Sequence, residues 1–207
     1  MSVIKLYRHP LSGHSHRVEL FLSLLGLKAE IIDVDLASGA HKQPEFLQKN
    51  GFGQLPVLED GDTVLADSNA ILIYLATKYD RNHTWLPVDP FLAAQVQRFL
   101  STAAGPIAYG PAAARLVNVF GAGLDHKNAI QTAHSVLAVL NAHLQNRDWL
   151  AAEQPTIADL ANYAYIAHAP EGDVSLEEYP NVKQWLKRIE QLSSFVSMQH
   201  TAAGLAA

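Results

Sequence analysis

The segment LYRHPLSGHSHRV, residues 6–18, gathers hydroxyl and imidazole side chains just after a predicted strand. Hydroxyl groups donate hydrogen bonds to anions, whereas imidazoles bind metals or carry protons. No carboxylate or cysteine with ligand spacing accompanies His9, His14 and His16, so we expect no metal site there. His134 and His143 fall on opposite sides of a predicted helix and do not form a ligand pair either.

A second segment, NGFGQLPVLEDGD, places Pro56 inside an apolar run that otherwise reads as a strand. A proline has no N–H for the ladder, so it belongs where the backbone is turned aside. We interpret this turn as presenting main chain to a bound peptide. Asp67 and Ser68 then open a predicted helix, whose exposed amides favour an anion. The glycines of this segment are not a dinucleotide loop, because the third glycine is missing.

Hydrophobic periodicity predicts the elements that position these residues. In chain order they are a strand at 3–7, a helix at 15–25, a strand at 29–36, a short helix near 44–50, a hairpin of 55–58 with 63–66, and a helix at 67–79. The first three elements form a parallel unit with a right-handed crossover. The order is that of a small α/β domain.

A polar segment with two prolines, residues 80–90, has the composition of a linker. No strand pattern follows it. The run from Phe91 to Phe120 is helical by composition but must kink or split near its glycines and prolines, Gly105, Pro106, Gly110 and Pro111. Further helices are predicted after Asp125, after the capping box of Thr156 with Asp159, and over 182–192. The second half is therefore a helical bundle.

The composition excludes several classes of function. The net charge of -5 gives the 207-residue chain no general attraction for nucleic acid. The absence of cysteine excludes disulfides, thiolate metal sites and thiol chemistry by the protein itself, so any thiol must come from a ligand. We find neither a signal-peptide pattern nor an apolar run long enough to span a membrane, and we expect a cytoplasmic protein.

Four segments are informative in combination: LYRHPLSGHSHRV, GAHKQPEFLQKNGFGQLPVLEDGD, LADSNAILIYLATKY and TIADL. With them the chain resembles the soluble glutathione S-transferases over nearly its whole length, as a bacterial member with a serine-type site. The resemblance implies a thioredoxin-like, glutathione-binding domain at 1–80 with the order βαβαββα, a linker at 81–90, and an all-helical domain at 91–207. It also implies a homodimer, with glutathione as co-substrate and a hydrophobic electrophile as its acceptor.

The resemblance assigns roles to individual residues. It implies a cis peptide bond at Pro56 and main-chain pairing of Val57 with the cysteinyl part of glutathione. Ser68 and Asp67 would hold the γ-glutamyl carboxylate and ammonium. The glycyl carboxylate would contact His41, Lys42 and Gln54. The electrophile would lie against the first long helix of the bundle, with candidates Ala104, Ile107, Tyr109, Arg115 and Tyr165, or Tyr163 in place of Tyr165.

The resemblance makes Ser12 the expected thiolate stabiliser, while Tyr7 and His14 remain alternatives. Ser15 is a weaker choice and is expected to cap the first helix instead. A hydrogen bond and a helix N-terminus each contribute about 2 kcal/mol, together enough to convert a few per cent of thiolate at neutral pH into a majority.

Other functions remain open on the same site. Glutathione-dependent peroxide reduction, isomerisation or dehalogenation would use the same thiolate, although the SSCSWR-type run of maleylacetoacetate isomerases is absent. The chain could instead bind glutathione or another ligand without turnover.

Overall fold

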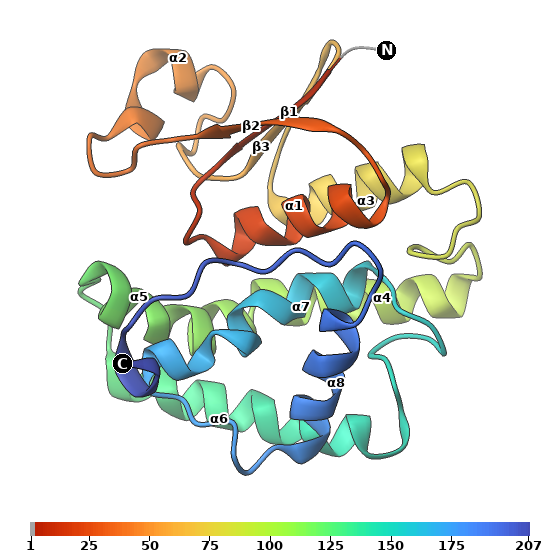
Figure 1. Ribbon diagram of the computed structural model, residues 1–207, viewed down its shortest axis with the longest axis vertical. Helices are drawn as coiled ribbons and strands as arrows, with labels where there is room; N and C mark the ends of the chain where they lie inside the picture. The colour runs from red at the N-terminus through yellow and green to blue at the C-terminus, as the bar shows by residue number, and fades with distance from the viewer. Residues whose placement is uncertain (1–2) are drawn as a thin grey trace. The chain divides into compact units, whose positions relative to one another are not determined.

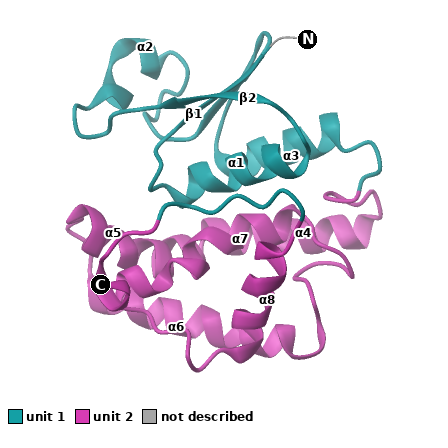
Figure 2. Ribbon diagram, viewed as in Figure 1, with its two compact units in different colours: residues 1–83, 193–199 teal, residues 84–192, 200–207 magenta. Residues whose placement is uncertain are grey.

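The computed structural model describes residues 3–207 (Figure 1). The chain divides into two compact units, coloured separately in Figure 2. The first comprises the residues up to His83 together with Ser193–Gln199, and the second comprises Thr84–Leu192 and His200–Ala207. The sequence patterns did not indicate that a C-terminal segment belongs to the first unit.

The first unit is built on a four-stranded mixed sheet of order β2-β1-β3-β4. Its strands are β1 (Ile4–Arg8), β2 (Ala29–Asp33), β3 (Val57–Asp60) and β4 (Thr63–Ala66). Strands β1 and β2 are parallel, whereas β3 pairs antiparallel with both β1 and β4. The expected order of strands and helices is confirmed, and it is that of the small α/β domain that the sequence predicted.

Several strand boundaries differ from prediction: β1 covers Ile4–Arg8 in place of 3–7, and β3 ends at Asp60 in place of residue 58. Strand β2 ends at Asp33 and not at residue 36, because the carboxylate of Asp35 accepts hydrogen bonds from the amides of Ala37 and Ser38 and turns the chain. Strand β3 begins at Val57 and not at Leu55, since Pro56 has no N–H for the ladder.

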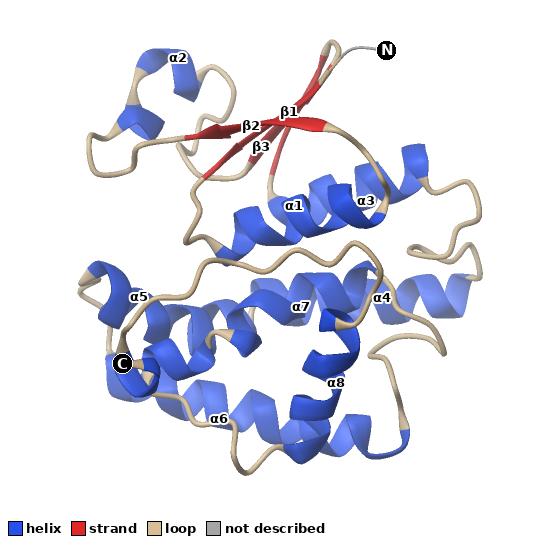
Figure 3. Cartoon of the chain, in the orientation of Figure 1, coloured by secondary structure: helices blue, strands red, loops and turns tan. Residues whose placement is uncertain are grey.

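Helices α1 (Gly13–Leu24) and α3 (Ser68–Tyr79) cover one face of this sheet, and α2 (Pro44–Leu47) lies beyond the other (Figure 3). Alternate residues of β1 point to opposite faces. Leu6 is fully buried, whereas Tyr7 packs with Phe46 of α2 and with Val57. Further along the chain, Val196 and Ser194 offer carbonyl oxygens to His16 and Ser23 of α1 and thereby attach the C-terminal segment to this unit.

The second unit is all helical, as predicted. Its main helices are α4 (Pro90–Ala104), α5 (Ala113–Phe120), α6 (His126–His143), α7 (Ile157–Ala167) and α8 (Pro180–Glu190). The expected break in the first long helical run is confirmed. Helix α4 ends before Gly105, and a π-helical turn, η2 (Ala108–Ala112), follows and contains Pro111. No described helix is long and apolar enough to cross a membrane.

A buried carboxylate joins α7 to α8. The capping box of Thr156 with Asp159 is confirmed, and Asp159 also accepts hydrogen bonds from the Leu150 amide and the indole of Trp185, both at 2.9 Å. Asp159 and Trp185 are fully buried. Because every oxygen of the carboxylate is hydrogen bonded, its burial is compatible with a tightly packed bundle.

Candidate functional site

A cavity of about 350 Å³ in the first unit brings together most of the predicted ligand-binding residues. It is lined by His14, Asn50, Phe52, Gln54, Leu55, Pro56, Ala66, Asp67 and Ser68. These residues come from the start of α1, the loop before β3, and the junction of β4 with α3. The residues before β3 therefore line one part of the cavity, and the N-terminus of α3 lines another.

Pro56 lies in the lining with a cis Leu55-Pro56 peptide bond, which confirms the prediction for this residue. Val57 does not line the cavity. It is the first residue of β3, is fully buried, and pairs with Tyr7 on one side and Ala66 on the other. Val57 stays a predicted main-chain partner of the peptide, while Leu55, which precedes the proline and lies outside the ladder, occupies the lining.

The N-terminus of α3 forms the polar end of the cavity. Asp67 is the N-cap and accepts a hydrogen bond from the Ala70 amide at 2.9 Å. Its φ of 71° is uncommon for a residue other than glycine, and such conformations are concentrated at functional sites. The exposed carboxylate of Asp67 stands beside the buried hydroxyl of Ser68, so an acid and a donor occupy adjacent positions.

Arg17 is a component of this site that sequence reasoning missed. Its side chain is buried, and Nη1 donates to Ser68 Oγ at 3.2 Å and to Asn69 Oδ1 at 2.7 Å. The guanidinium thereby adds a positive charge next to the N-terminus of α3, where the helix dipole also favours an anion. The signal in the sequence was the spacing of Arg17 from Phe21, four positions apart, which places the arginine on the same helical face as a buried aromatic residue.

His14 lines the cavity, and its Nδ1 lies 3.4 Å from Ser68 Oγ. Burial, aided by the nearby charge of Arg17, lowers the pKa of His14 to about 3. The imidazole is therefore neutral at physiological pH. His14 stays an alternative thiolate stabiliser, because a neutral ring can still donate a hydrogen bond.

Ser12, not Ser15, caps α1. The backbone of Ser12 is extended, as an N-cap requires, and its Oγ accepts a hydrogen bond from the Ser15 amide at 3.2 Å. Ser15 is fully buried and its Oγ accepts from the amide of His9. Ser12 is half-buried and does not line the cavity, but its hydroxyl proton remains available for donation while the oxygen accepts.

Tyr7 is not among the residues that line the cavity. Its ring meets Phe46 edge-on, with centroids 6.3 Å apart, and the ammonium of Lys49 lies 5.0 Å from the ring centroid. Because β1 directs this side chain toward α2, the structure does not support Tyr7 as a thiol-activating group.

His41 and Lys42 form a short helical turn, Ala40–Lys42, that borders the loop before β3. Lys42 Nζ donates to the carbonyl of Phe52 at 3.1 Å. Gly53 has a φ of 57°, and a Cβ at this position would lie only 2.7 Å from the His41 carbonyl oxygen. The close approach of these two segments therefore depends on a glycine. Neither basic residue lines the cavity itself.

The candidate electrophile residues lie in the second unit and are mostly inaccessible. Ile107 is fully buried, Tyr165 is 5% exposed, and Arg115 is 1% exposed with its Nε 2.6 Å from Glu171. Tyr163 is also buried, whereas Ala104 and Tyr109 are exposed. Arg115 was predicted to contact substrate, and in this structure it forms an ion pair with Glu171 inside the bundle. Ile107 and Tyr165 are core residues of the second unit.

Comparison with known proteins gives a consistent result. A family model described as "Glutathione S-transferase, N-terminal domain" matches residues 2–77, and one described as "Glutathione S-transferase, C-terminal domain" matches residues 124–193. Glutathione S-transferase 3 of Zea mays is 37% identical, covering 99% of this chain and 96% of the relative.

Solved structures agree. A glutathione S-transferase from Pseudomonas fluorescens superimposes with a TM-score of 0.90 at 32% identity, covering 96% of this chain and all of that one. A glutathione transferase homologue from Drosophila mojavensis, solved with bound glutathione, gives a TM-score of 0.85 at 29% identity over 93% of this chain and 89% of its own.

Proposed function

This chain belongs to the glutathione S-transferase family, and from that membership we propose that it binds glutathione in the cavity of its first unit and conjugates it to electrophilic, hydrophobic small molecules. One observation carries the proposal. The cavity brings the main chain at Leu55 and cis Pro56 together with the anion-favouring N-terminus of α3 at Ser68. An extended peptide with an anionic end suits this combination.

The γ-glutamyl end of glutathione carries a carboxylate and an ammonium group. We assign the carboxylate to the hydroxyl and amide of Ser68, at the positive end of the α3 dipole. The carboxylate of Asp67 pairs with the ammonium. Arg17, which donates to Ser68, orients the hydroxyl and adds favourable charge behind it.

The cysteinyl part pairs with the main chain at Leu55, in the manner of a strand added to a sheet. Gln54 continues this part of the lining toward the glycyl carboxylate. His41 and Lys42 lie on the turn that borders the cavity loop and supply the basic groups for that carboxylate. In the proposed division, residues 1–80 bind glutathione, 81–90 form the linker, and 91–207 line the electrophile site.

Ser12 is the proposed thiolate stabiliser. Its hydroxyl donates its proton to the sulfur while its oxygen continues to accept from Ser15. The N-terminus of α1 adds a favourable dipole, so that glutathione ionises near neutral pH. The bound thiolate attacks the electrophilic carbon, and the leaving group or the adjacent atom takes the electron pair. Positioning and ionisation are the contributions of the protein.

One observation favours a second candidate, a glutathione-binding protein without turnover. Ser12 is already the cap of α1 and stands outside the cavity lining. If this geometry persists when glutathione is bound, the thiol gains no donor and stays protonated.

The ultraviolet absorbance of the bound thiolate, followed against pH in the wild type and in Ser12→Ala, tests the proposal. A thiol pKa well below about 8.5 that returns toward that value in the variant supports catalysis through Ser12. Binding with an unchanged thiol pKa supports the second candidate. A lowered pKa that survives the substitution overturns the role of Ser12, and a failure to bind glutathione overturns the proposal.

We further propose a homodimer in the cytoplasm. Large apolar side chains are exposed on both units, including Phe52 at 82%, Val88 at 75% and Phe91 at 67%. Where such side chains form a contiguous exposed patch, the patch marks a surface that a partner covers. Sedimentation equilibrium distinguishes a dimer from a monomer.

A further inference from the structure

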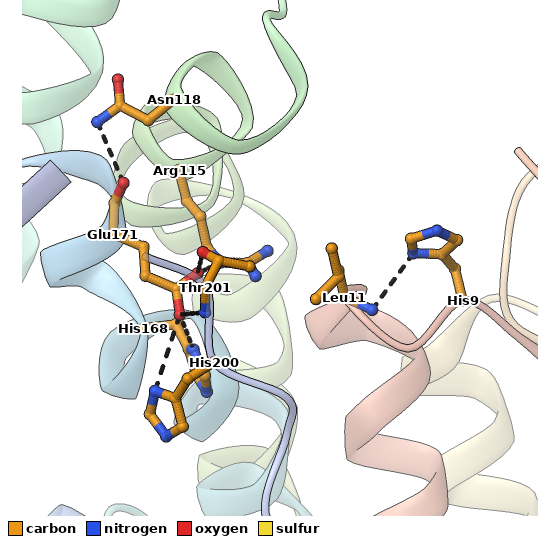
Figure 4. Close-up of polar contacts among 8 residues, drawn as sticks. All are labelled: His9, Leu11, Arg115, Asn118, His168, Glu171, His200 and Thr201. Carbon is orange, nitrogen blue, oxygen red and sulfur yellow. Dashed lines mark hydrogen bonds and ion pairs between the residues drawn. The ribbon is translucent and has the colours of Figure 1, made fainter. Parts of the chain in front are cut away.

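A buried carboxylate in the second unit collects hydrogen bonds from separate parts of the chain (Figure 4). Glu171 lies in the short helical turn Ala169–Gly172, labelled η4, and is 1% exposed. Arg115 Nε, at 2.6 Å, and Thr201 Oγ1, at 2.7 Å, donate to its Oε2, while the Thr201 amide, at 3.1 Å, donates to Oε1. His168 Nδ1 lies 2.6 Å from the same Oε1.

Two imidazoles converge on this oxygen. The rings of His168 and His200 are stacked with centroids 4.4 Å apart and an interplanar angle of 30°. His200 Nδ1 lies 3.8 Å from Glu171 Oε1, and its side chain is 74% exposed. The three potential ligand atoms all lie within 4.8 Å of one another. His168 and Glu171 are therefore held inside the unit, while His200 leaves a route from solvent.

We propose that His168, Glu171 and His200 form a binding site for a divalent transition-metal ion of the zinc type. Two imidazole nitrogens and one carboxylate oxygen are ligands that zinc prefers, and water can complete a tetrahedral shell. Ligand atoms about 2 Å from a tetrahedral zinc ion stand about 3.3 Å apart. The separations of 2.6 Å and 3.8 Å from Oε1 bracket that value, and the separation of the two imidazole nitrogens is within 4.8 Å, so the exposed His200 ring moves to complete the site.

The tautomer of His168 is compatible with metal binding. A neutral imidazole carries one ring proton, and placing that proton on Nε2 frees Nδ1 for the metal.

The remaining partners of Glu171 act as supports. Arg115 and the Thr201 hydroxyl hold Oε2, while the Thr201 amide occupies one lone pair of Oε1 and leaves the other for the metal; hydrogen bonds of this kind are usual around a ligating carboxylate. The positive charge of Arg115 also opposes a second cation, so we expect micromolar and not nanomolar dissociation constants.

Metal binding also attaches the C-terminal segment that contains His200 to the rest of the second unit. His200 and Thr201 belong to the C-terminal segment, which packs closely against η4: a Cβ at Gly204 would lie 2.7 Å from the carbonyl oxygens of Glu171 and Pro170. An ion shared by His168 of the bundle and His200 of this segment links the two. Binding to the folded state alone then raises the unfolding temperature.

The test uses tag-free, chelator-treated full-length protein and compares His200→Asn with the matched control His83→Asn. Both histidines are exposed, and asparagine tolerates the left-handed backbone of His83. We expect calorimetry to give one zinc equivalent per chain, cobalt to give visible absorption, and zinc to raise the unfolding temperature. His200→Asn should weaken binding at least tenfold and lose the stabilisation, while His83→Asn keeps both.

Saturable zinc binding that is equal in the two variants would place the ion elsewhere and overturn the assignment. The absence of saturable binding by zinc and cobalt would also overturn it. Both readouts are independent of glutathione, so they separate this inference from the proposed function.

Discussion

Arg17 of α1 donates a hydrogen bond to the hydroxyl of Ser68 in α3 at 3.2 Å, across 51 positions of the chain. Asn69 accepts a second bond from the same guanidinium nitrogen. The pair connects two helices on one face of the sheet and stands at the polar end of the cavity. The buried guanidinium of Arg17 therefore stabilises the packing of the first unit and also adds positive charge at its proposed ligand site.

Replacing this cation should affect ligand affinity and stability together. In Arg17→Met we expect glutathione to bind about 10-fold or more weakly, because hydrogen bonds to charged groups contribute about 1.5 to 3 kcal/mol. Stability should also fall, since Ser68 and Asn69 lose their donor. Calorimetric titration and urea unfolding measure the two effects. The exposed Arg81→Met is the control, and equal affinity in both variants contradicts the assignment.

Tyr7 should be dispensable for thiol ionisation. Its ring packs against Phe46 and does not line the cavity. We expect Tyr7→Phe to leave the thiol pKa of bound glutathione unchanged and the turnover rate within about 2-fold, since removing only the hydroxyl preserves the packing. The thiolate absorbance of the variant checks this. A higher thiol pKa in Tyr7→Phe than in the wild type would show that Tyr7 stabilises the thiolate.

Gly53 and Gly51 provide a matched pair on the cavity loop. Gly53→Ala should destabilise the protein by about 1 to 3 kcal/mol and weaken glutathione binding, because the new Cβ meets the His41 carbonyl at 2.7 Å in a left-handed backbone. No atom lies within 4 Å of the corresponding Cβ at Gly51, so Gly51→Ala should be nearly neutral. Urea unfolding and glutathione titration compare the two, and similar losses would refute the argument.

The free energy of unfolding should fall at acidic pH because of Glu171. Burial by itself raises the pKa of this carboxyl, but hydrogen bonds from Thr201 and His168 and the charge of Arg115 lower it to about 2, from 4.5 in the unfolded chain. The native state therefore binds fewer protons than the unfolded state between these values. The resulting stability, on the order of 3 kcal/mol, is present above pH 4.5 and is lost as the pH falls toward 2.

Thr201→Val removes the hydroxyl donor and should weaken this dependence, since the folded-state pKa of Glu171 moves back toward its unfolded value. Urea unfolding at several pH values, with a chelator present, measures the slope. Thr102→Val is the control, because the Thr102 hydroxyl bonds to its own helix at the Arg98 carbonyl. An identical slope in the two variants would show that Thr201 does not hold the charge of Glu171.

The amino-acid sequence by itself determined the features that depend on near neighbours. Helix periodicity and the capping residues Asp67, Asp125 and Thr156 predicted where helices begin, and those starts are confirmed. The break of the long helical run followed from the special chemistry of proline and glycine, and the cis bond at Pro56 followed from the resemblance of its segment to the family. Such signals are local, because caps and turns form within a few residues of the side chain that causes them.

Only the tertiary structure decided which distant residues meet. It directed Tyr7 toward α2, set Arg17 behind Ser68, and joined Arg115 to Glu171. It also attached residues 193–199 to the first unit. These pairings depend on the face of a strand, the packing of helices and the neutralisation of buried charge, which are satisfied only when the whole chain is folded. The sequence identifies an arginine as a cation, but only the folded structure determines which group it pairs with.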